Sequence, residues 1–483
     1  MVRTKRLRSP RYAAALCAAA ALVLGLSASP PASAERVRRN IDDLDTQQLG
    51  DYLHAVAKLK EISRQDPASK DGYVNFAELH DEFDVGPCEH SSDTFLPWHR
   101  AHLLEFEDAL RRSDPPRTVD VTVPYWDWSR LPTGRRYAKA FEDTQSVLYA
   151  SGRHDKPICK LDGDPQCEGL PWPRSYLEAK VLTASGWRGV GAAFFGGVSD
   201  DNLLCRPRRR TGYGALEQPA HNDMHSVYIG GLMRSPTTAA EDPIFWSFHA
   251  YIDLLLAQWQ ENAGHAIDTC LDCELCGLTK RSDGSPWRVR DTLSTADLGY
   301  RYEYVPAVVP PPLLMMAEGA LFPPLPAAGM ALSGRLPIEV LRTMEVPVPE
   351  AVEAPVMFTL TGVPRPSSFS YNGDVYLYPE GEEFTPRNER FRRRFLVDVF
   401  SIWESHHAHT VESAETEIVL DLTEEMQALS AGHAGETWNL TVALVANTLG
   451  RESRHAFAAD AVGEESSFAE QMSFDRMDLE GLR

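Results

Sequence analysis

Apolar residues in the first two-thirds of the chain recur at helical spacing. Between about 41 and 110 they stand every three to four residues, at Leu44, Leu49, Leu53, Val56 and Leu59 and later at Leu103, Phe106 and Leu110. This period predicts amphipathic helices, and Asp45-Thr46 offers an N-cap to the first of them. The spacing returns at 219–232 and 242–262. Residues 119–128 predict an extended stretch, and the Gly-rich residues 150–215 predict loops.

The last third of the chain has a different pattern. Short runs rich in β-branched and aromatic residues begin at Val356, Asp374, Phe395, Glu417 and Leu440, with turn residues between them. Such spacing predicts a β-sandwich of about 120 residues. A cluster of prolines between 306 and 326 predicts a linker ahead of it. The last residues of the chain are acidic and polar, and they predict a disordered tail.

Residues 1–34 have the three parts of a secretory signal peptide: basic residues, an apolar Ala/Leu run of about 15 residues, and Pro-Ala-Ser-Ala. The run is short for a membrane span, and an uncleaved anchor is the alternative. We therefore expect a secreted or periplasmic protein with no stable membrane association after cleavage. The predicted organisation is a signal peptide at 1–34, a mainly helical domain at 35–304, a Pro-rich linker at 305–344, a β-rich domain at 345–460 and an acidic tail at 461–483.

The charge of the chain bears on its partners. With 69 acidic and 48 basic residues among 483, the net charge is −21. Cleavage after Ala34 would remove five basic residues and no acidic one, which takes the charge from −21 to −26. This balance argues against nucleic acid, whose phosphates need a basic face, and it disfavours an anionic membrane surface.

Six histidines are spaced as metal ligands could be: His80, His90, His99, His221, His225 and His249. His221 and His225 lie four residues apart on a predicted helix, so both imidazoles project from one face. Asp253, one turn beyond His249, could accept an N–H from a ligand histidine or pair with an arginine. Neutral imidazole suits copper, zinc, iron and nickel. Spacing alone leaves a metal site and ordinary packing equally open.

Two local strings carry a family resemblance. Residues 90–107 (HSSDTFLPWHRAHLLEFE) resemble the first copper signature of the tyrosinase family, and residues 242–253 (DPIFWSFHAYID) resemble the second. The resemblance covers roughly residues 36–304, including Pro124–Trp128 and Leu298–Tyr302. The last string is similar to the tyrosine motif that closes the catalytic domain of plant polyphenol oxidases. The chain thus resembles the type-3 dicopper proteins, to which molluscan haemocyanin is related.

The resemblance implies a mainly α catalytic domain in which a four-helix bundle holds a dicopper site, followed by a C-terminal β-sandwich-like domain. The implied ligands are His80, His90 and His99 for the first copper ion, and His221, His225 and His249 for the second. His80 is assigned because Phe76–His80 ends a helical stretch ahead of the loop that bears His90; His54 is the alternative. The family usually has an aromatic residue at the position of His102, so we interpret His102 as a packing residue.

Two further residues are implicated by the resemblance, and one residue departs from the family pattern. Glu217 lies four residues before His221, where plant-type members carry a glutamate that holds a water, and Asn222 follows His221 directly. In the family this pair is proposed to position a base that deprotonates the phenol, whose pKa is near ~10. The alternatives are a surface carboxylate and a polar residue on a helix surface. Phe248 stands where many members carry a histidine, and it is expected to narrow the pocket.

The implied activity is oxidation of o-diphenols to o-quinones with O₂, together with hydroxylation of monophenols. The expected partners are therefore phenolic small molecules and O₂. A haemocyanin-like oxygen carrier and an o-aminophenol oxidase are the alternatives; a single site with Glu217 and Asn222 favours the enzyme. Several members have a C-terminal β-domain that covers the copper site and keeps the enzyme latent. A side chain from Leu314, Met315, Met316 or Phe322 could occupy the site, and His406, His407 and His409 could hand over copper or form an exposed cluster.

The cysteines complete the prediction. Of eight, the signal peptide holds Cys17, which leaves seven in an export-competent context. Cys88 stands two residues before His90, as in family members whose cysteine sulfur forms a thioether with the histidine ring. A thioether would leave six cysteines, enough for three disulfides. Cys159 and Cys167 suit a local disulfide. The run of Cys270, Cys273 and Cys276, with Cys205 available, favours disulfides over a zinc or iron–sulfur fragment.

Overall fold

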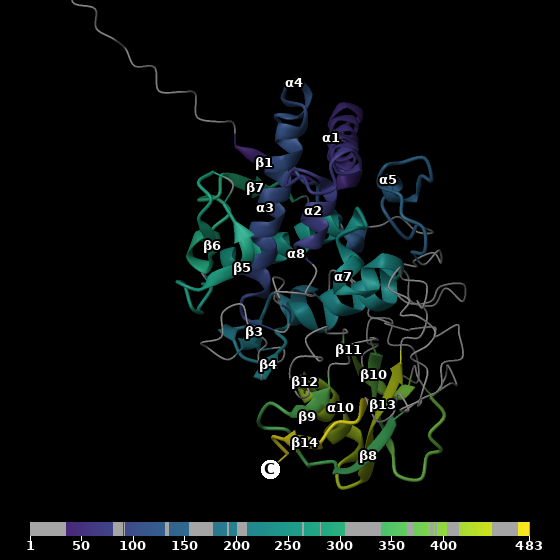
Figure 1. Cartoon of the computed structure of the whole chain (residues 1–483). Helices are drawn as coiled ribbons and strands as arrows, with labels where there is room; N and C mark the ends of the chain where they lie inside the picture. Colours follow the sequence, from purple (N-terminus) through teal and green to yellow (C-terminus); the bar gives the residue numbers. More distant parts are fainter. Residues whose placement is uncertain are drawn as a thin grey trace, which may run out of the picture. The chain divides into compact units, whose positions relative to one another are not determined.

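The computed structural model describes residues 35–80, 90, 92–130, 135–153, 177–190, 193–199, 210–262, 265–280, 282–304, 340–364, 371–386, 391, 394–402, 415–446 and 472–482. The chain divides into a short unit, Met1–Glu35, and a large unit, Arg36–Arg483. Every helix and strand below lies in the large unit (Figure 1). Among the described residues, no helix is both long and apolar enough to cross a membrane.

Four helices build the core of the first part: α1 (Thr46–Gln65), α2 (Tyr73–Glu78), α3 (Phe95–Ser113) and α8 (Ile244–Glu261). Helix α1 begins at a capping box in which the Asp45 side chain accepts from the backbone of Gln48 and the Gln48 side chain accepts from that of Asp45. Helix α3 packs against both α1 and α8, and α1 packs against α2. Most residues of α3 and α8 are buried, so these two helices form the centre of one hydrophobic core. The helices expected from the apolar period are confirmed.

Shorter helical segments connect these four helices. They are η1 (Ile41–Asp43), α4 (Pro115–Thr118), η2 (Trp128–Arg130), α5 (Lys139–Glu142), η3 (Leu177–Val181), η4 (Leu216–His221), η5 (Met224–Ile229), η6 (Gly231–Arg234), α7 (Pro236–Ala239) and η7 (Val289–Thr292). Segments η4 and η5 are π-helical, and Gln218 inside η4 has an extended backbone (φ −122°, ψ 123°). The helix predicted at 219–232 is therefore present but wider and kinked.

Small sheets surround the helical core. Strand β1 (Arg36–Arg38) pairs in parallel with β7 (Tyr300–Tyr302), and β5 (Glu274–Thr279) pairs with β6 (Pro286–Arg288). Strands β2 (Gly186–Arg188), β3 (Phe194–Ser199) and β4 (Arg210–Gly212) lie within the region predicted as loops. That prediction was wrong for these three strands, and the longest of them, β3, shows why. The aromatic residues outweigh the glycines there, because Phe195 is buried and stacks on Trp259 of α8 with ring centroids 4.7 Å apart.

Two sheets form the C-terminal part. In the first, β8 (Val340–Pro347), β10 (Tyr371–Pro379), β11 (Leu396–Ile402) and β13 (Thr437–Ala446) are antiparallel in the order β11-β10-β13-β8. In the second, β9 (Met357–Pro364) lies between β12 (Glu415–Asp421) and β14 (Arg476–Glu480). Both sheets contribute to one core, and helix α10 (Thr423–His433) packs into it through Met426 and Leu429. All five predicted β-runs are strands, as a sandwich-like arrangement requires.

Two boundaries differ from the expectation. Strand β8 begins at Val340, inside the range assigned to the linker. The tail was predicted to be disordered, and this is wrong for Met472–Leu482, where β14 pairs with β9. Met472 and Phe474 are buried in the C-terminal core and anchor the strand despite its acidic surroundings.

The two parts of the large unit share a sheet. Strand β12 pairs in parallel with β4, Glu415 opposite Arg210 and Glu417 opposite Gly212, which gives one six-stranded sheet in the order β14-β9-β12-β4-β3-β2. Tyr213, directly after β4, is buried in the C-terminal core. Strand β11 contacts η4, the segment that ends at His221. Backbone hydrogen bonds therefore join the β-rich part to the part that carries the histidines.

Candidate metal centre

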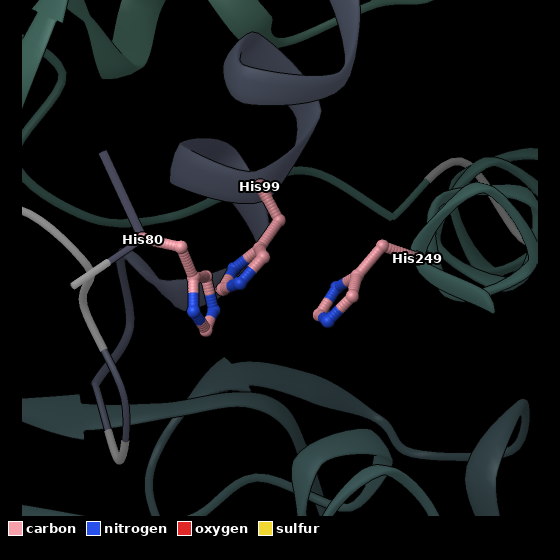
Figure 2. A group of neighbouring side chains, drawn as sticks. All are labelled: His80, His99 and His249. Atoms are coloured by element: carbon pink, nitrogen blue, oxygen red, sulfur yellow. The ribbon is translucent and has the colours of Figure 1, made fainter. Parts of the chain in front are cut away.

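The candidate histidines come from separate segments that the core brings together. His99 on α3 and His249 on α8 are buried and stacked, with ring centroids 4.2 Å apart and planes 7° apart. His80 follows the end of α2, and its ring lies 5.4 Å from that of His99. Figure 2 shows these three imidazoles extending from three backbone segments into one space. Their approach depends on the packing of α3 against α8.

Two overlapping groups of three histidines result. His80, His99 and His249 each offer a nitrogen within 4.8 Å of the others, and so do His221, His225 and His249. His249 belongs to both groups, and its Nε2 lies 3.1 Å from Nε2 of His225. All five residues are buried. The sequence placed His249 only in the second set, whereas the packing puts it between the two.

His90, the remaining predicted ligand, lies beside both groups. Its ring centroid is 5.3 Å from that of His80, 5.5 Å from that of His99 and 5.8 Å from that of His221. The side chain is buried. The structure therefore brings all six predicted histidines into one cluster. Residues 81–89 and 91, which flank His90, lie outside the described residues.

Hydrogen bonds fix the tautomer of four of these imidazoles. His80 Nδ1 lies 2.7 Å from the carbonyl of Pro236, His99 Nδ1 lies 2.9 Å from that of Phe95, and His225 Nδ1 lies 2.9 Å from that of Met233. His221 Nδ1 lies 2.9 Å from Oδ1 of Asn222. Because each partner is an oxygen acceptor, each Nδ1 must carry the proton. The lone pair is then on Nε2, the arrangement that metal-ligating histidines use.

The electrostatics of the cluster keep its members neutral. Burial lowers the pKa of His99, His221, His225 and His249 well below the usual value, and neighbouring histidines lower it further. A neutral imidazole with an unprotonated Nε2 is the form that binds a metal ion. Nitrogen donors without a carboxylate or thiolate suit the later first-row metals, with copper highest in affinity. Two buried groups of this composition are consistent with a dinuclear copper site.

Glu217 lies on η4, the segment that ends at His221, and Asn222 follows His221 directly. Both are 1% exposed, so the alternatives of a surface carboxylate and a surface polar residue are wrong. Asn222 accepts from His221 through Oδ1 and donates through Nδ2 to Oε1 of Gln218, 2.9 Å away. The extended backbone at Gln218 allows this chain of hydrogen bonds. Gln218 was not identified from the sequence, although its place four residues before Asn222 is the signal that could have found it.

Phe248 packs between the second group and the PYWDW string (Pro124–Trp128). Its ring lies 4.9 Å from His225, 5.6 Å from His221 and 5.4 Å from Trp128, and it is fully buried. The aromatic side chain therefore packs directly against two of the candidate histidines. Its expected effect on the width of the pocket stays a prediction.

Two other histidines, His54 and His102, belong to neither of the two histidine groups. His54, the alternative to His80, pairs with Asp114 through Nε2 at 2.8 Å. His102 is buried, and its Nε2 bonds to the carbonyl of Phe76 at 2.9 Å. Neither contributes a nitrogen to the groups found among the described residues.

Asp253 pairs with arginines, which was one of the two alternatives open from the sequence. Its Oδ1 lies 2.5 Å from Nε of Arg100, and its Oδ2 lies 3.3 Å from Nη1 of Arg38. The hydroxyls of Tyr300 and Tyr302 each donate to Oδ2 at 2.6 Å. This buried network joins β1, α3, α8 and β7, so the tyrosine string acts structurally by closing the helical core.

The structure contains a disulfide in the Cys270, Cys273 and Cys276 run, whose pairing the sequence left open. Cys270 and Cys273 are bonded, in agreement with the preference for disulfides in this run. Strand β5, which follows this disulfide, lies next to α3, and Trp98 Nε1 donates to the carbonyl of Cys276 at 2.8 Å. The predictions for Cys88, Cys159, Cys167 and Cys205 concern residues outside the described ones, as do those for Leu314, Met315, Met316, Phe322, His406, His407 and His409.

The fold and the site define a class of protein, one with a helical core that holds two adjoining groups of buried histidines. Residues 70–262 match the common central domain of tyrosinase. The chain is 32% identical over 245 residues to a tyrosinase of Streptomyces glaucescens, covering 46% of this chain and 82% of the relative. It is also 26% identical over 242 residues to a G-type haemocyanin of Enteroctopus dofleini, covering 47% of this chain and 8% of the relative.

A solved structure extends the likeness in fold to the C-terminal part. Latent aurone synthase, a polyphenol oxidase, superposes with a TM-score of 0.63 at 17% identity, covering 93% of this chain and 90% of the other. The chain therefore belongs to the tyrosinase/polyphenol oxidase family of type-3 copper proteins, which is related to haemocyanin.

Proposed function

We propose that the protein is a copper-dependent oxidase that uses O₂ to oxidise o-diphenols to o-quinones and to hydroxylate monophenols. The observation that carries the proposal is the histidine cluster, in which four Nδ1–H groups are bound to oxygen acceptors. The buried Glu217, on the segment that ends at His221, adds a proton acceptor that an oxygen carrier does not need. Two copper ions held there would supply the redox chemistry that couples phenol oxidation to the reduction of O₂.

The residues of the chain have separable roles in this reaction. Each diphenol gives up two electrons and two protons, so two diphenols reduce one O₂ to two water molecules. Glu217 would accept the proton of the incoming hydroxyl, which leaves slowly at neutral pH because phenols have a pKa near ~10. Asn222 orients the ring of His221 by accepting a hydrogen bond from its Nδ1–H, and Gln218 orients Asn222 by accepting one from its Nδ2.

Oxygen uptake by the copper-loaded protein tests the proposal. Catechol and tyrosine are supplied in separate assays, with o-aminophenol as the third substrate. Turnover of catechol to the quinone, and of tyrosine after a lag, is the expected result. Reversible O₂ binding without turnover of any of the three would show a carrier instead. Turnover of o-aminophenol alone would show that the protein is an o-aminophenol oxidase.

A Glu217→Gln variant should lose monophenol hydroxylation selectively. The amide keeps the size of the side chain but cannot accept the proton, and general-base catalysis contributes about 10²–10⁴-fold. We expect kcat/KM for tyrosine to fall about 100-fold. The loss for catechol should be smaller, because its second, neighbouring hydroxyl makes it less dependent on deprotonation by Glu217. Steady-state rates for both substrates measure the ratio.

The control for this variant is Glu261→Gln, which changes an exposed carboxylate near the end of α8. Copper content is measured in both proteins to exclude an effect on the metal. Equal losses for tyrosine and catechol in Glu217→Gln at full copper content would contradict a role in deprotonating the monophenol.

We also propose that the β-rich part covers the copper site and keeps the enzyme latent. Strand β11 contacts η4, which carries Glu217 and His221, and the similar aurone synthase structure is described as latent. The pairing of β12 with β4 adds a hydrogen-bonded attachment. Cutting the chain between the parts is therefore not enough to separate them.

Cleavage at a protease site introduced within 305–339 should leave the two fragments associated. Removal of the C-terminal fragment in mild denaturant should then raise diphenol oxidation at least about tenfold, the factor that corresponds to about 1.4 kcal/mol of blocking contacts. Size-exclusion chromatography and oxygen uptake measure the two steps. The control is the same chain without protease. Unchanged activity of the separated helical fragment, still folded and copper-loaded, would count against the shield.

The N-terminal pattern supports one more proposal, namely that the enzyme acts outside the cytoplasm. Residues 1–34 combine a basic start, an apolar run and a small-residue cleavage site. The thioether between Cys88 and His90 stays a prediction from the Cys-x-His spacing.

A further inference from the structure

His102 is the buried histidine for which the proposed reaction has no use. It lies one turn after His99 on α3, yet its ring packs into an aromatic box instead of joining the cluster. The ring centroids of Trp98 and Trp246 are 4.7 and 4.8 Å away. Its Nε2 is 2.9 Å from the carbonyl oxygen of Phe76 on α2. A phenylalanine would fill the same box without making this bond.

The carbonyl of Phe76 stands at the point where α2 ends. In a continuing α-helix it would accept from the backbone N–H of His80, four residues later. Here the backbone N–H of His80 donates to the carbonyl of Ala77, three residues earlier, at 3.0 Å. The last turn of α2 is therefore of the tighter 3₁₀ type. The donor that a longer helix would give to Phe76 is replaced by Nε2–H of His102.

The chemistry of the bond fixes the role of His102. A carbonyl oxygen can only accept, so Nε2 carries the proton and cannot bind a metal ion. Burial also lowers the pKa of His102 to about 3, so the ring stays neutral. The bond joins α3, which carries His99, to the end of α2, from which His80 emerges. On the other side, His80 is held by the carbonyl of Pro236 through Nδ1.

We propose that His102 is a positioning residue for the first copper ligand: its Nε2–H holds the last turn of α2 and so sets the place of His80 relative to His99. The inference rests on the proposed function only in taking His80 as a ligand. His102 would thus support the site through a hydrogen bond. A phenylalanine at this position could supply the packing but not the hydrogen bond.

Copper binding by paired variants tests the proposal. His102→Phe keeps the aromatic packing and removes the donor, whereas His102→Gln keeps a donor near the position of Nε2. Loss of a partner that orients a ligand typically costs 10–100-fold in metal affinity. We expect EDTA to remove one copper ion from His102→Phe about 10–100-fold faster than from the wild type, and the second at the wild-type rate. His102→Gln should stay close to the wild type in both steps.

A second measurement needs no copper. Hydrogen exchange of the peptide 73–80 in the metal-free chain should be faster in His102→Phe and unchanged in His102→Gln. Ser63→Ala is the matched control, because Ser63 Oγ accepts from the N–H of Val74 at 2.9 Å at the other end of α2. It should loosen the start of the helix and leave both copper ions in place. If His102→Phe does not fold, His102→Leu serves as the donor-free variant.

Two outcomes would overturn the proposal. One is a donor-free variant that keeps wild-type copper kinetics and exchange. The other is an equal loss in His102→Phe and His102→Gln, which would show that packing matters and the hydrogen bond does not. A wild-type protein that binds two copper ions but oxidises no phenol would refute the proposed function and leave this inference standing.

Discussion

A His249→Ala variant is expected to lose phenol oxidation almost completely, with kcat/KM for catechol reduced at least about 1,000-fold, or about 4 kcal/mol of transition-state stabilisation. His249 offers a nitrogen to both histidine groups and lies 3.1 Å from His225 through Nε2. Its removal therefore weakens two sites at once, whereas loss of His80 would weaken one. Oxygen uptake measures the rate, and metal analysis should find at most one copper ion per chain.

The matched control is His265→Ala. His265 stacks on Trp259 with ring centroids 4.5 Å apart, outside both groups, so its loss should leave rate and copper content unchanged. Circular dichroism of the metal-free proteins checks that each variant folds. A folded His249→Ala protein with two copper ions and more than a tenth of the wild-type rate would contradict the assignment of this residue as a copper ligand.

Asp253→Asn should produce the largest loss of stability among single substitutions away from the histidines. Asp253 pairs with Arg38 and Arg100, which are both fully buried. Removing one partner of a buried ion pair costs about 3–5 kcal/mol, and here Arg100 loses the carboxylate it pairs with, whereas Arg38 keeps its pair with Glu107. We expect that decrease in the free energy of unfolding, measured by urea denaturation of the metal-free chain. Asp268→Asn, at an exposed carboxylate, should change it by less than about 0.5 kcal/mol.

The same network has a predictable dependence on pH. Burial opposes ionisation of Asp253, but Arg100, Arg38 and the two tyrosine hydroxyls outweigh it and lower its pKa below the ordinary value of 3.8. A carboxyl whose pKa is lower in the folded state contributes stability above its unfolded pKa and loses it as the pH falls through the folded pKa. The difference in stability between wild type and Asp253→Asn should therefore be constant above about pH 5 and shrink below pH 4. A difference that grows on acidification would contradict this account.

Some features of the site could be predicted because they are local. His221 and His225 are four residues apart, so any helical turn brings them near one another, and the π-helical form that the structure shows does not undo this. The strands of the C-terminal part are likewise local patterns of β-branched and aromatic residues. Where opposing local signals met, prediction failed: glycines suggested a loop at Phe194–Ser199, but the burial of Phe195 made it a strand.

The sequence by itself determined the family, the identity of the candidate histidines and the order of the helical and β-rich parts. All three depend on short local motifs or on the periodicity of apolar residues. Only the tertiary structure decided that His249 stands between the two groups, that Asp253 pairs with arginines, and that His102 donates to the carbonyl of Phe76. These contacts join residues 26 to 215 positions apart along the chain. Their partners are chosen by how α2, α3 and α8 pack, and packing depends on the whole core rather than on any one segment.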